Sequence, residues 1–161
     1  MMNSPAIVIT LVALMTFGVT DVRGMGKEDA DPPKSQKNIY SEGKSAVNAG
    51  RYQTAIQLLK KVIAQDPKNA DAHNYLGFSY RKIGKLNLAA ESYKQVFSVE
   101  PNHKGALEYQ GELFLRLGNI TSAKLNLAKL AKLCPSKCKE FAELKRAIAD
   151  FIATRGVRKG S

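Results

Sequence analysis

A period of 34 residues constrains what this chain can fold into more than any other feature of its sequence. Small residues and prolines recur at that spacing in four columns. The columns are Gly43, Gly77 and Gly111; Gly50, Gly84 and Gly118; Ala55, Ala89 and Ala123; and Pro67, Pro101 and Pro135. At ordinary residue frequencies the glycine and proline columns would align by chance roughly once in ten million trials. The chain therefore contains three copies of one structural unit.

Each copy carries the signals of two helices joined by a tight turn. Glycines of the second column stand where a first helix would end in a left-handed cap, and the prolines prevent the second helix from continuing. The expected helices are 36–49, 52–65, 70–83, 86–99, 104–117 and 120–133. A hydrophobic content of 44% is normal for a folded domain. The absence of Trp, the aromatic content of 7% and the lack of alternating Val/Ile-rich runs argue against a β-sandwich or barrel. The predicted fold class is all-α.

Glycines of the first column fall inside the first helix of each copy. A glycine there costs about 1 kcal/mol relative to alanine, so we expect a neighbouring backbone to need the space. The facing small residues on the second helices would be Ala55, Ala89 and Ala123.

The central copy, residues 70–103, carries nearly a whole family signature. Its positions are Leu76, Gly77, Tyr80, Gly84, Ala89, Tyr93 and Pro101. This pattern resembles a tetratricopeptide repeat, and the resemblance implies a right-handed α-solenoid of three units, 36–69, 70–103 and 104–137. The flanking copies match more loosely, and the family is defined by its packing, so the resemblance indicates the fold more sharply than the function.

The resemblance also implies that first helices of successive repeats line a concave groove. Mapped onto this chain, the groove positions are Tyr40, Lys44, Val47, Asn48, Asn74, Phe78, Arg81, Lys82, Glu108, Glu112, Leu115 and Arg116. Phe78 beside Arg81 and Lys82 has the composition of a peptide-binding hot spot; the alternative is that Phe78 packs between adjacent first helices. Some relatives clamp C-terminal carboxylates with Lys, Asn and Arg. The corresponding positions here are Tyr40, Tyr75, Gly105 and Tyr109, which disfavours that mode.

An uncharged segment near the start indicates export. Residues 6–19 have the length of a signal-peptide core and fall short of the about 20 residues that a transmembrane helix needs. No Lys or Arg precedes them, which departs from the usual pattern. We expect residues 1–24 to be a secretory signal, most simply to a bacterial periplasm, with an uncleaved membrane anchor and a misassigned start codon as alternatives. Residues 25–35 are expected to form a flexible leader.

Downstream of the third repeat, residues 138–152 predict one more helix. Their apolar stripe consists of Phe141, Leu144, Ile148 and Phe151. A solenoid needs such a helix, with one polar face, to cover its last repeat. The tail, residues 153–161, is basic and predicted to be disordered.

Two cysteines, Cys134 and Cys138, flank the last repeat proline. In an oxidising compartment they would form a disulfide that fixes the capping helix to the third repeat. The alternatives are two buried thiols or, less in keeping with the spacing, a redox-active pair.

No motif predicts catalysis, a cofactor or a metal site. His73 is interpreted as a packing residue and His103 as a solvent-exposed loop residue, since neither has a partner at metal-ligand spacing. Glu108 and Glu112 lie four residues apart, which on a polar helix face usually means a solvated patch. The chain is therefore not expected to be an enzyme or to bind a small-molecule substrate.

The formal net charge is +11, which makes acidic partners, nucleic acid and anionic membranes worth considering. Much of the excess lies on the second helices and the capping helix, at Lys60, Lys61, Lys94, Lys124, Lys129, Lys132, Lys145 and Arg146. The leading hypothesis is a protein–protein interaction module that holds a peptide or helix of a partner in the groove. Alternatives are polyanion or membrane-surface binding through the basic face, with nucleic acid disfavoured, and self-assembly into a homo-oligomer.

Overall fold

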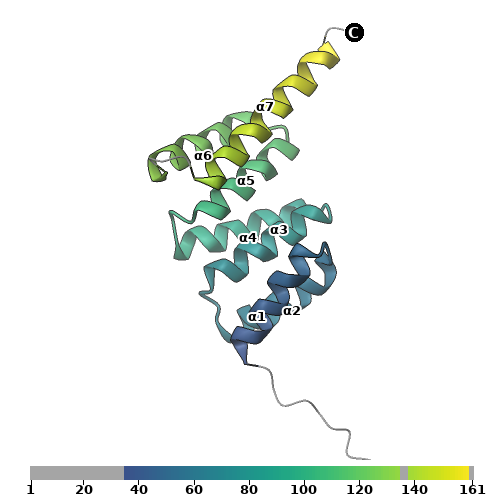
Figure 1. The fold of residues 1–161 in the computed structure, drawn as a ribbon, viewed down its shortest axis with the longest axis vertical. Coiled ribbons are helices and arrows are strands. Elements are labelled where there is room, and N and C mark those ends of the chain that lie inside the picture. Colours follow the sequence, from purple (N-terminus) through teal and green to yellow (C-terminus); the bar gives the residue numbers. More distant parts are fainter. Residues whose placement is uncertain (1–34, 135–137, 160–161) are drawn as a thin grey trace, which may run out of the picture. The chain divides into compact units, whose positions relative to one another are not determined.

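A computed structural model describes residues 35–134 and 138–159, with side chains up to residue 154. These ranges contain seven helices and no strand (Figure 1). The helices are α1 (Gln36–Asn48), α2 (Tyr52–Gln65), α3 (Ala70–Lys82), α4 (Leu86–Val99), α5 (Lys104–Arg116), α6 (Ile120–Leu133) and α7 (Lys139–Lys159). The predicted signal and leader, except Ser35, lie outside the described residues.

Three helical hairpins follow one another along the chain, as the period predicts. Helix α1 packs on α2, α3 on α4 and α5 on α6, while α2 contacts α3 and α4 contacts α5 (Figure 1). The first helices also contact each other, α1 with α3 and α3 with α5. This arrangement confirms the all-α solenoid. The first helices end one residue earlier than expected, and the second helices have the expected bounds.

Glycine caps end the first helix of every hairpin. The φ angles of Gly50, Gly84 and Gly118 are 71°, 78° and 78°, in the left-handed region that glycine favours. At α3 the N–H of Lys85 donates to the Tyr80 carbonyl at 2.9 Å and the N–H of Gly84 donates to the Arg81 carbonyl at 3.1 Å. This pair of bonds is the Schellman motif, which turns the chain into the second helix.

The starts of the first helices are capped by a column that the sequence analysis did not identify. Ser35, Asn69 and His103 stand 34 residues apart, and each side chain accepts a backbone N–H of its helix. His103 Nδ1 accepts from the N–H of Ala106 at 3.1 Å and the residue is 9% exposed. The prediction of a solvated His103 is therefore wrong, because its ring nitrogen replaces the usual cap oxygen. His73 is buried, as predicted, and donates to the Pro67 carbonyl at 2.9 Å.

Side chains, and not backbones, occupy the space over the first glycine column. A Cβ added to Gly77 would lie 2.7 Å from Cε1 of Tyr93, and one added to Gly111 would lie 2.6 Å from Leu144. At Gly43 the nearest atoms belong to Leu59, at 3.2 Å. The expectation of facing alanines is therefore wrong: the glycines make room for larger residues. Ala55, Ala89 and Ala123 are fully buried in the core.

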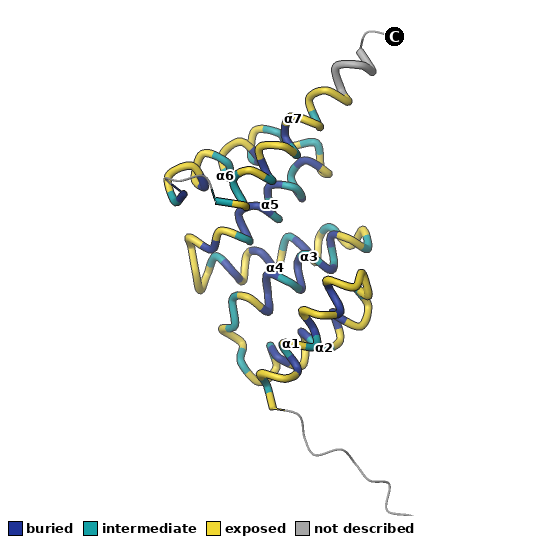
Figure 2. Tube along the Cα trace, viewed as in Figure 1, coloured by how far each residue is buried: buried dark blue, intermediate teal, exposed yellow. Residues whose placement is uncertain are grey.

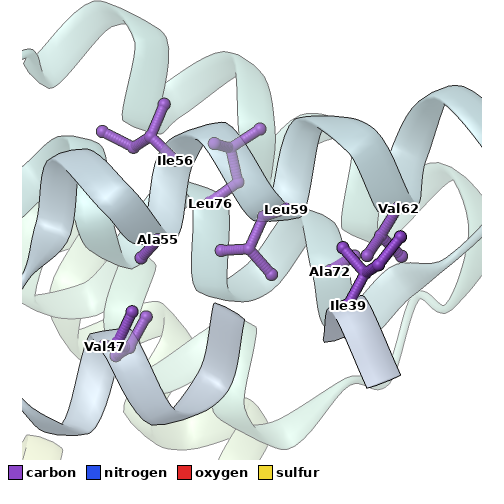
Figure 3. Packing of buried hydrophobic residues seen from close by; sticks show 9 residues of the cluster. Ile39, Val47, Ala55, Ile56, Leu59, Val62, Ala72 and Leu76 are labelled. Atoms are coloured by element: carbon purple, nitrogen blue, oxygen red, sulfur yellow. The ribbon is translucent and has the colours of Figure 1, made fainter. Parts of the chain in front are cut away.

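The core lies between the hairpins as a chain of apolar clusters. In the first, Ile39 and Val47 of α1 meet Leu59 of α2 and Leu76 of α3 (Figure 3). Buried and exposed residues alternate within the turns of each helix (Figure 2). The buried positions are mainly apolar, so neighbouring hairpins bury apolar residues against each other. Successive repeats thus bury surfaces that one hairpin alone would expose.

Helix α7 covers the last hairpin. Leu144 and Ile148 are buried in a cluster with residues of α5 and α6, and Phe141 and Phe151 pack against it. The helix continues to Lys159, so the prediction of a disordered tail is wrong for residues 153–159. That segment has no proline, and extending a helix is far easier than starting one. No helix among the described residues is long and apolar enough to span a membrane.

A disulfide joins Cys134, the C-terminal cap of α6, to Cys138, the residue before α7. The two Cα atoms are 5.4 Å apart. It connects the end of the third repeat to the start of the covering helix, as the first of the sequence-based alternatives predicts.

Candidate functional site

The first helices α1, α3 and α5 form one face of the hairpin stack, which we call the first-helix face. Half-buried aromatic side chains from all three helices occupy it: Tyr40, Tyr75, Phe78 and Tyr109. The ring centroids of Tyr40 and Tyr75 are 6.3 Å apart, and those of Phe78 and Tyr109 are 4.6 Å apart. These contacts tie successive repeats together and leave part of each ring accessible.

Phe78 combines the two interpretations that the sequence left open. Its ring contacts Tyr109 of the next repeat and lies 6.1 Å from Tyr52 of the preceding one. The ammonium nitrogen of Lys82 stands 5.2 Å from the ring centroid. Phe78 therefore packs between repeats, while its remaining exposed surface has a cation beside it.

Arg81 is not the free groove cation that the sequence predicts. It is 4% exposed and forms an ion pair with Glu112 of α5. The guanidinium carbon lies 5.2 Å from the Phe78 ring centroid and 5.8 Å from that of Tyr109. Arg116 donates from Nη1 to the Arg81 carbonyl at 2.7 Å. Arg81 thus joins two repeats, which a solvated arginine could not do.

The remaining predicted groove residues divide by exposure. Lys44, Asn48, Lys82 and Arg116 are exposed on the first-helix face, and Glu112 is partly exposed beside Arg81. Val47, Asn74, Glu108 and Leu115 are buried. The solvated carboxylate pair predicted for Glu108 and Glu112 is therefore wrong, since one is buried and the other is paired.

Glu108 has an unusual electrostatic environment. It is 5% exposed, and burial together with the charges of Glu143, Glu112 and Glu140 raises its pKa to about 8, against a smaller opposing effect of Arg81. The carboxyl group is therefore mostly protonated at neutral pH in the free protein.

A cavity of about 240 Å³ lies beside Glu108, where α3, α5 and α7 meet. Its lining residues are Asp71, Asn74, Tyr75, His103, Gly105, Glu108, Tyr109, Lys139, Glu140 and Glu143. Four of these carry carboxyl groups and one is a lysine, whose Nζ lies 3.7 Å from Glu143. The chain has a net charge of +11, so a cavity in which carboxyl groups outnumber basic side chains is unexpected.

His103 forms one side of this cavity and connects two repeats. Its Nε2 donates to Asp71 of α3 at 3.2 Å. The hydrogen bond from His103 holds the pKa of Asp71 below its ordinary value. Burial lowers the pKa of His103, but the hydrogen bond to Asp71 and the charge of Glu100 together raise it above its ordinary value.

Most cavity residues were not candidates in the sequence analysis. Tyr75 and Tyr109 stand 34 residues apart, a signal that was considered only as a mismatch to the carboxylate clamp. Glu140 and Glu143 belong to α7, which was interpreted only as a cover. Among the described residues, no group of three His, Cys, Asp or Glu side chains could hold a metal ion.

The second helices and α7 carry a set of exposed cations, which we call the basic surface. Every lysine and arginine assigned to it from the sequence is exposed: Lys60, Lys61, Lys94, Lys124, Lys129, Lys132, Lys145 and Arg146. These side chains come from α2, α4, α6 and α7, and of the residues that line the acidic cavity none belongs to this set.

Two family models match the repeats. One, described as TPR repeat, matches residues 43–84, and the other, described as tetratricopeptide repeat, matches residues 78–136. The chain belongs to the tetratricopeptide repeat (TPR) proteins. The family is generally a non-catalytic protein-interaction fold, so this TPR protein is a protein–protein interaction module. No curated protein sequence matches it significantly.

Solved structures of other TPR proteins share the fold. The first TPR domain of human RPAP3 has a TM-score of 0.65 and 19% identity, with 75% of this chain and 94% of that chain covered. The Yersinia enterocolitica type III secretion translocator chaperone SycD has a TM-score of 0.63 and 20% identity, with 78% of this chain and 95% of that chain covered. The second TPR domain of human RPAP3 was solved in complex with the HSP70 peptide SGPTIEEVD. It has a TM-score of 0.60 and 22% identity, with 70% of this chain and 98% of that chain covered.

Proposed function

We propose that the first-helix face of this TPR protein binds a segment of another polypeptide. The observation that carries the proposal is the row of half-buried aromatic side chains across α1, α3 and α5. Partly exposed aromatic rings held by a rigid scaffold are typical anchors of protein interfaces. The human RPAP3 domain, whose complex contains an HSP70 peptide, supports a peptide as the bound form.

Binding on this face needs little rearrangement. The rings of Tyr75, Phe78 and Tyr109 are held by packing between repeats, and Arg81 is held by Glu112. Side chains that are already ordered lose little further conformational entropy when a partner docks. The partner therefore meets a preformed surface, with Lys44, Lys82 and Arg116 available at its edges.

The residues at the clamp positions and the acidic cavity beside them argue against a chaperone C-terminus as the partner. The positions that relatives use as a carboxylate clamp are Tyr40, Tyr75, Gly105 and Tyr109, and the last three line the acidic cavity. An acidic peptide end would be repelled there.

Site-specific photo-crosslinking in the native host tests the proposal. A photoreactive amino acid replaces exposed Lys82 on the first-helix face or, as the matched control, Leu125 on α6, which is 67% exposed. We expect a discrete crosslinked protein from position 82 and none from position 125. The same partner crosslinked equally from both positions would contradict the proposal.

We also propose that the protein is exported. The uncharged segment at residues 6–19 and the Cys134–Cys138 pair both fit an oxidising compartment, and the periplasm of a bacterium is the simplest one. Mass spectrometry of the protein from its native host tests this: we expect a mature chain without the first 24 or so residues and with oxidised cysteines. An intact N-terminus with two free thiols would contradict it.

A second candidate function is polyanion binding through the basic surface, favoured by the exposure of all eight assigned cations. The dependence of partner binding on ionic strength distinguishes polyanion binding from peptide binding on the first-helix face. A contact made by several Lys and Arg side chains weakens steeply with ionic strength, whereas an aromatic-anchored contact on the first-helix face does not.

A further inference from the structure

We propose that the acidic cavity between α3, α5 and α7 is a specificity pocket for a lysine or arginine side chain of the bound polypeptide. This inference rests on the proposed function and names the chemistry that its partner must carry.

Charge and shape at the cavity fit a basic side chain. Asp71, Glu108, Glu140 and Glu143 supply four carboxyl groups against the cations of Lys139 and, when protonated, His103, and the rings of Tyr75 and Tyr109 form part of the wall. Carboxylates accept charge-assisted hydrogen bonds from ammonium and guanidinium groups, and aromatic faces attract the same cations. Since a water molecule takes about 30 Å³ of liquid volume, a cavity of about 240 Å³ has room for a side-chain end and several waters.

A buried acceptor at the cavity lacks a partner within the described residues. Asn74 is 4% exposed, and its Oδ1 accepts no hydrogen bond. Glu108 is 5% exposed, and its carboxyl group faces the cavity. Buried acceptors are normally satisfied. Both groups line the cavity, so a cationic donor entering it would supply the hydrogen bond that Asn74 Oδ1 lacks and would favour the ionised form of Glu108.

Gly105 keeps this space open. A Cβ at this position would lie 3.1 Å from Nδ2 of Asn74 and 3.4 Å from Cε1 of His103. A side chain here would press on two residues that line the cavity. The glycine therefore allows Asn74 and His103 to form its wall.

A metal ion is a poorer occupant than a basic side chain. The cavity carboxylates do not converge closely enough, since no set of three His, Cys, Asp or Glu side chains in the described ranges could hold a metal ion. A guanidinium or ammonium group on a flexible stem can reach separate acceptors, because its donors spread over a wider area.

Nuclear magnetic resonance titration of the full chain tests the pocket without knowledge of the partner. The probes are N-acetyl-arginine methylamide and N-acetyl-lysine methylamide, with the citrulline and norleucine analogues as uncharged controls of similar shape. We expect the basic probes to shift the Asn74 side-chain amide signal and to bind at least about tenfold more tightly than the uncharged ones.

Substitutions of the cavity carboxyl groups test whether the basic probes bind in the cavity. Glu108→Gln should weaken the arginine probe about tenfold, and Glu143→Gln should weaken it in the same direction. Glu91→Gln, an exposed carboxyl group on α4, is the matched control and should leave binding unchanged. Equal binding of charged and uncharged probes, or binding that folded Glu108→Gln and Glu143→Gln both leave unaltered, would overturn the pocket.

The two proposals fail in different ways. Tyr40 belongs to the first-helix face but does not line the cavity, so an effect of Tyr40→Ala on partner binding tests the face alone. If Tyr40→Ala weakens partner binding and Glu108→Gln leaves it unchanged, the specificity pocket is refuted and the proposed function of the first-helix face stands.

Discussion

Arg81 of α3 and Glu112 of α5 form an ion pair across the boundary between the second and third repeats. The arginine is 4% exposed and its guanidinium also lies over the rings of Phe78 and Tyr109. Arg81 therefore links the second and third repeats through an ion pair and through contacts with two aromatic rings.

Replacing Arg81 with Ala should destabilise the protein by about 3 kcal/mol, because Glu112 would lose its partner beside other carboxyl groups. Urea unfolding followed by circular dichroism measures the change. Lys94→Ala, an exposed cation on α4, is the control and should stay within about 0.5 kcal/mol of the wild type. A double-mutant cycle with Glu112→Gln that shows no coupling would refute the pairing.

Glu108 should make stability depend on pH. The folded protein holds a proton on this carboxyl group up to about pH 8, whereas the ordinary pKa in an unfolded chain is 4.5. The folded state therefore binds more protons between these values, so stability falls as pH rises through that window. The loss should be on the order of 2 kcal/mol, since the carboxyl group retains some contact with solvent through the cavity.

Glu108→Gln should remove that part of the pH dependence. His103, whose raised pKa acts in the same direction above its ordinary value of 6.5, remains in both proteins, so the difference between their unfolding free energies isolates Glu108. The variant should gain stability relative to the wild type as pH rises to about 9. Parallel curves for the two proteins would show that Glu108 titrates normally.

Gly77→Ala should destabilise the second repeat by about 1–3 kcal/mol, although alanine is the better helix former. The added Cβ would meet the fully buried ring of Tyr93 at 2.7 Å. Gly43→Ala is the matched variant: it meets a flexible Leu59 at 3.2 Å and should cost less. Thermal unfolding compares the two, and an equal or smaller effect at Gly77 would contradict the packing described.

Reducing the Cys134–Cys138 disulfide should loosen α7 locally and leave the repeats folded. A loop this short contributes only about 2 kcal/mol in the chain-entropy account. Hydrogen exchange before and after reduction measures the effect: amides of α7 should exchange faster while those of α3 stay protected. Global unfolding on reduction would show that the disulfide holds more than the covering helix.

The sequence predicted the hairpins well because their signals are local. Gly84 and Pro101 each determine the conformation of only the few residues around them, and equivalent residues recur every 34 positions. The predicted bounds of the six hairpin helices agree with the structure within one residue. The period also contained the cap column of Asn69 and His103, but histidine is a rare cap and was not recognised.

The candidate site was harder to predict because its contacts join different repeats. Arg81 and Glu112 lie 31 positions apart in the chain, and nothing near either residue indicates the pairing. Glu143 approaches Glu108 only because α7 packs on α5. Which groove residues are exposed, and where charges gather, depends on packing between repeats and not on the repeat pattern.

The most direct test of the account is the dissociation constant of the crosslinked partner for three purified proteins: the wild type, Tyr40→Ala and Leu125→Ala. Each variant removes one large side chain, from the first-helix face and from α6 respectively. The account predicts that Tyr40→Ala weakens binding at least about tenfold and that Leu125→Ala leaves it unchanged. Equal dissociation constants for wild type and a folded Tyr40→Ala, or a larger loss at Leu125, would contradict it.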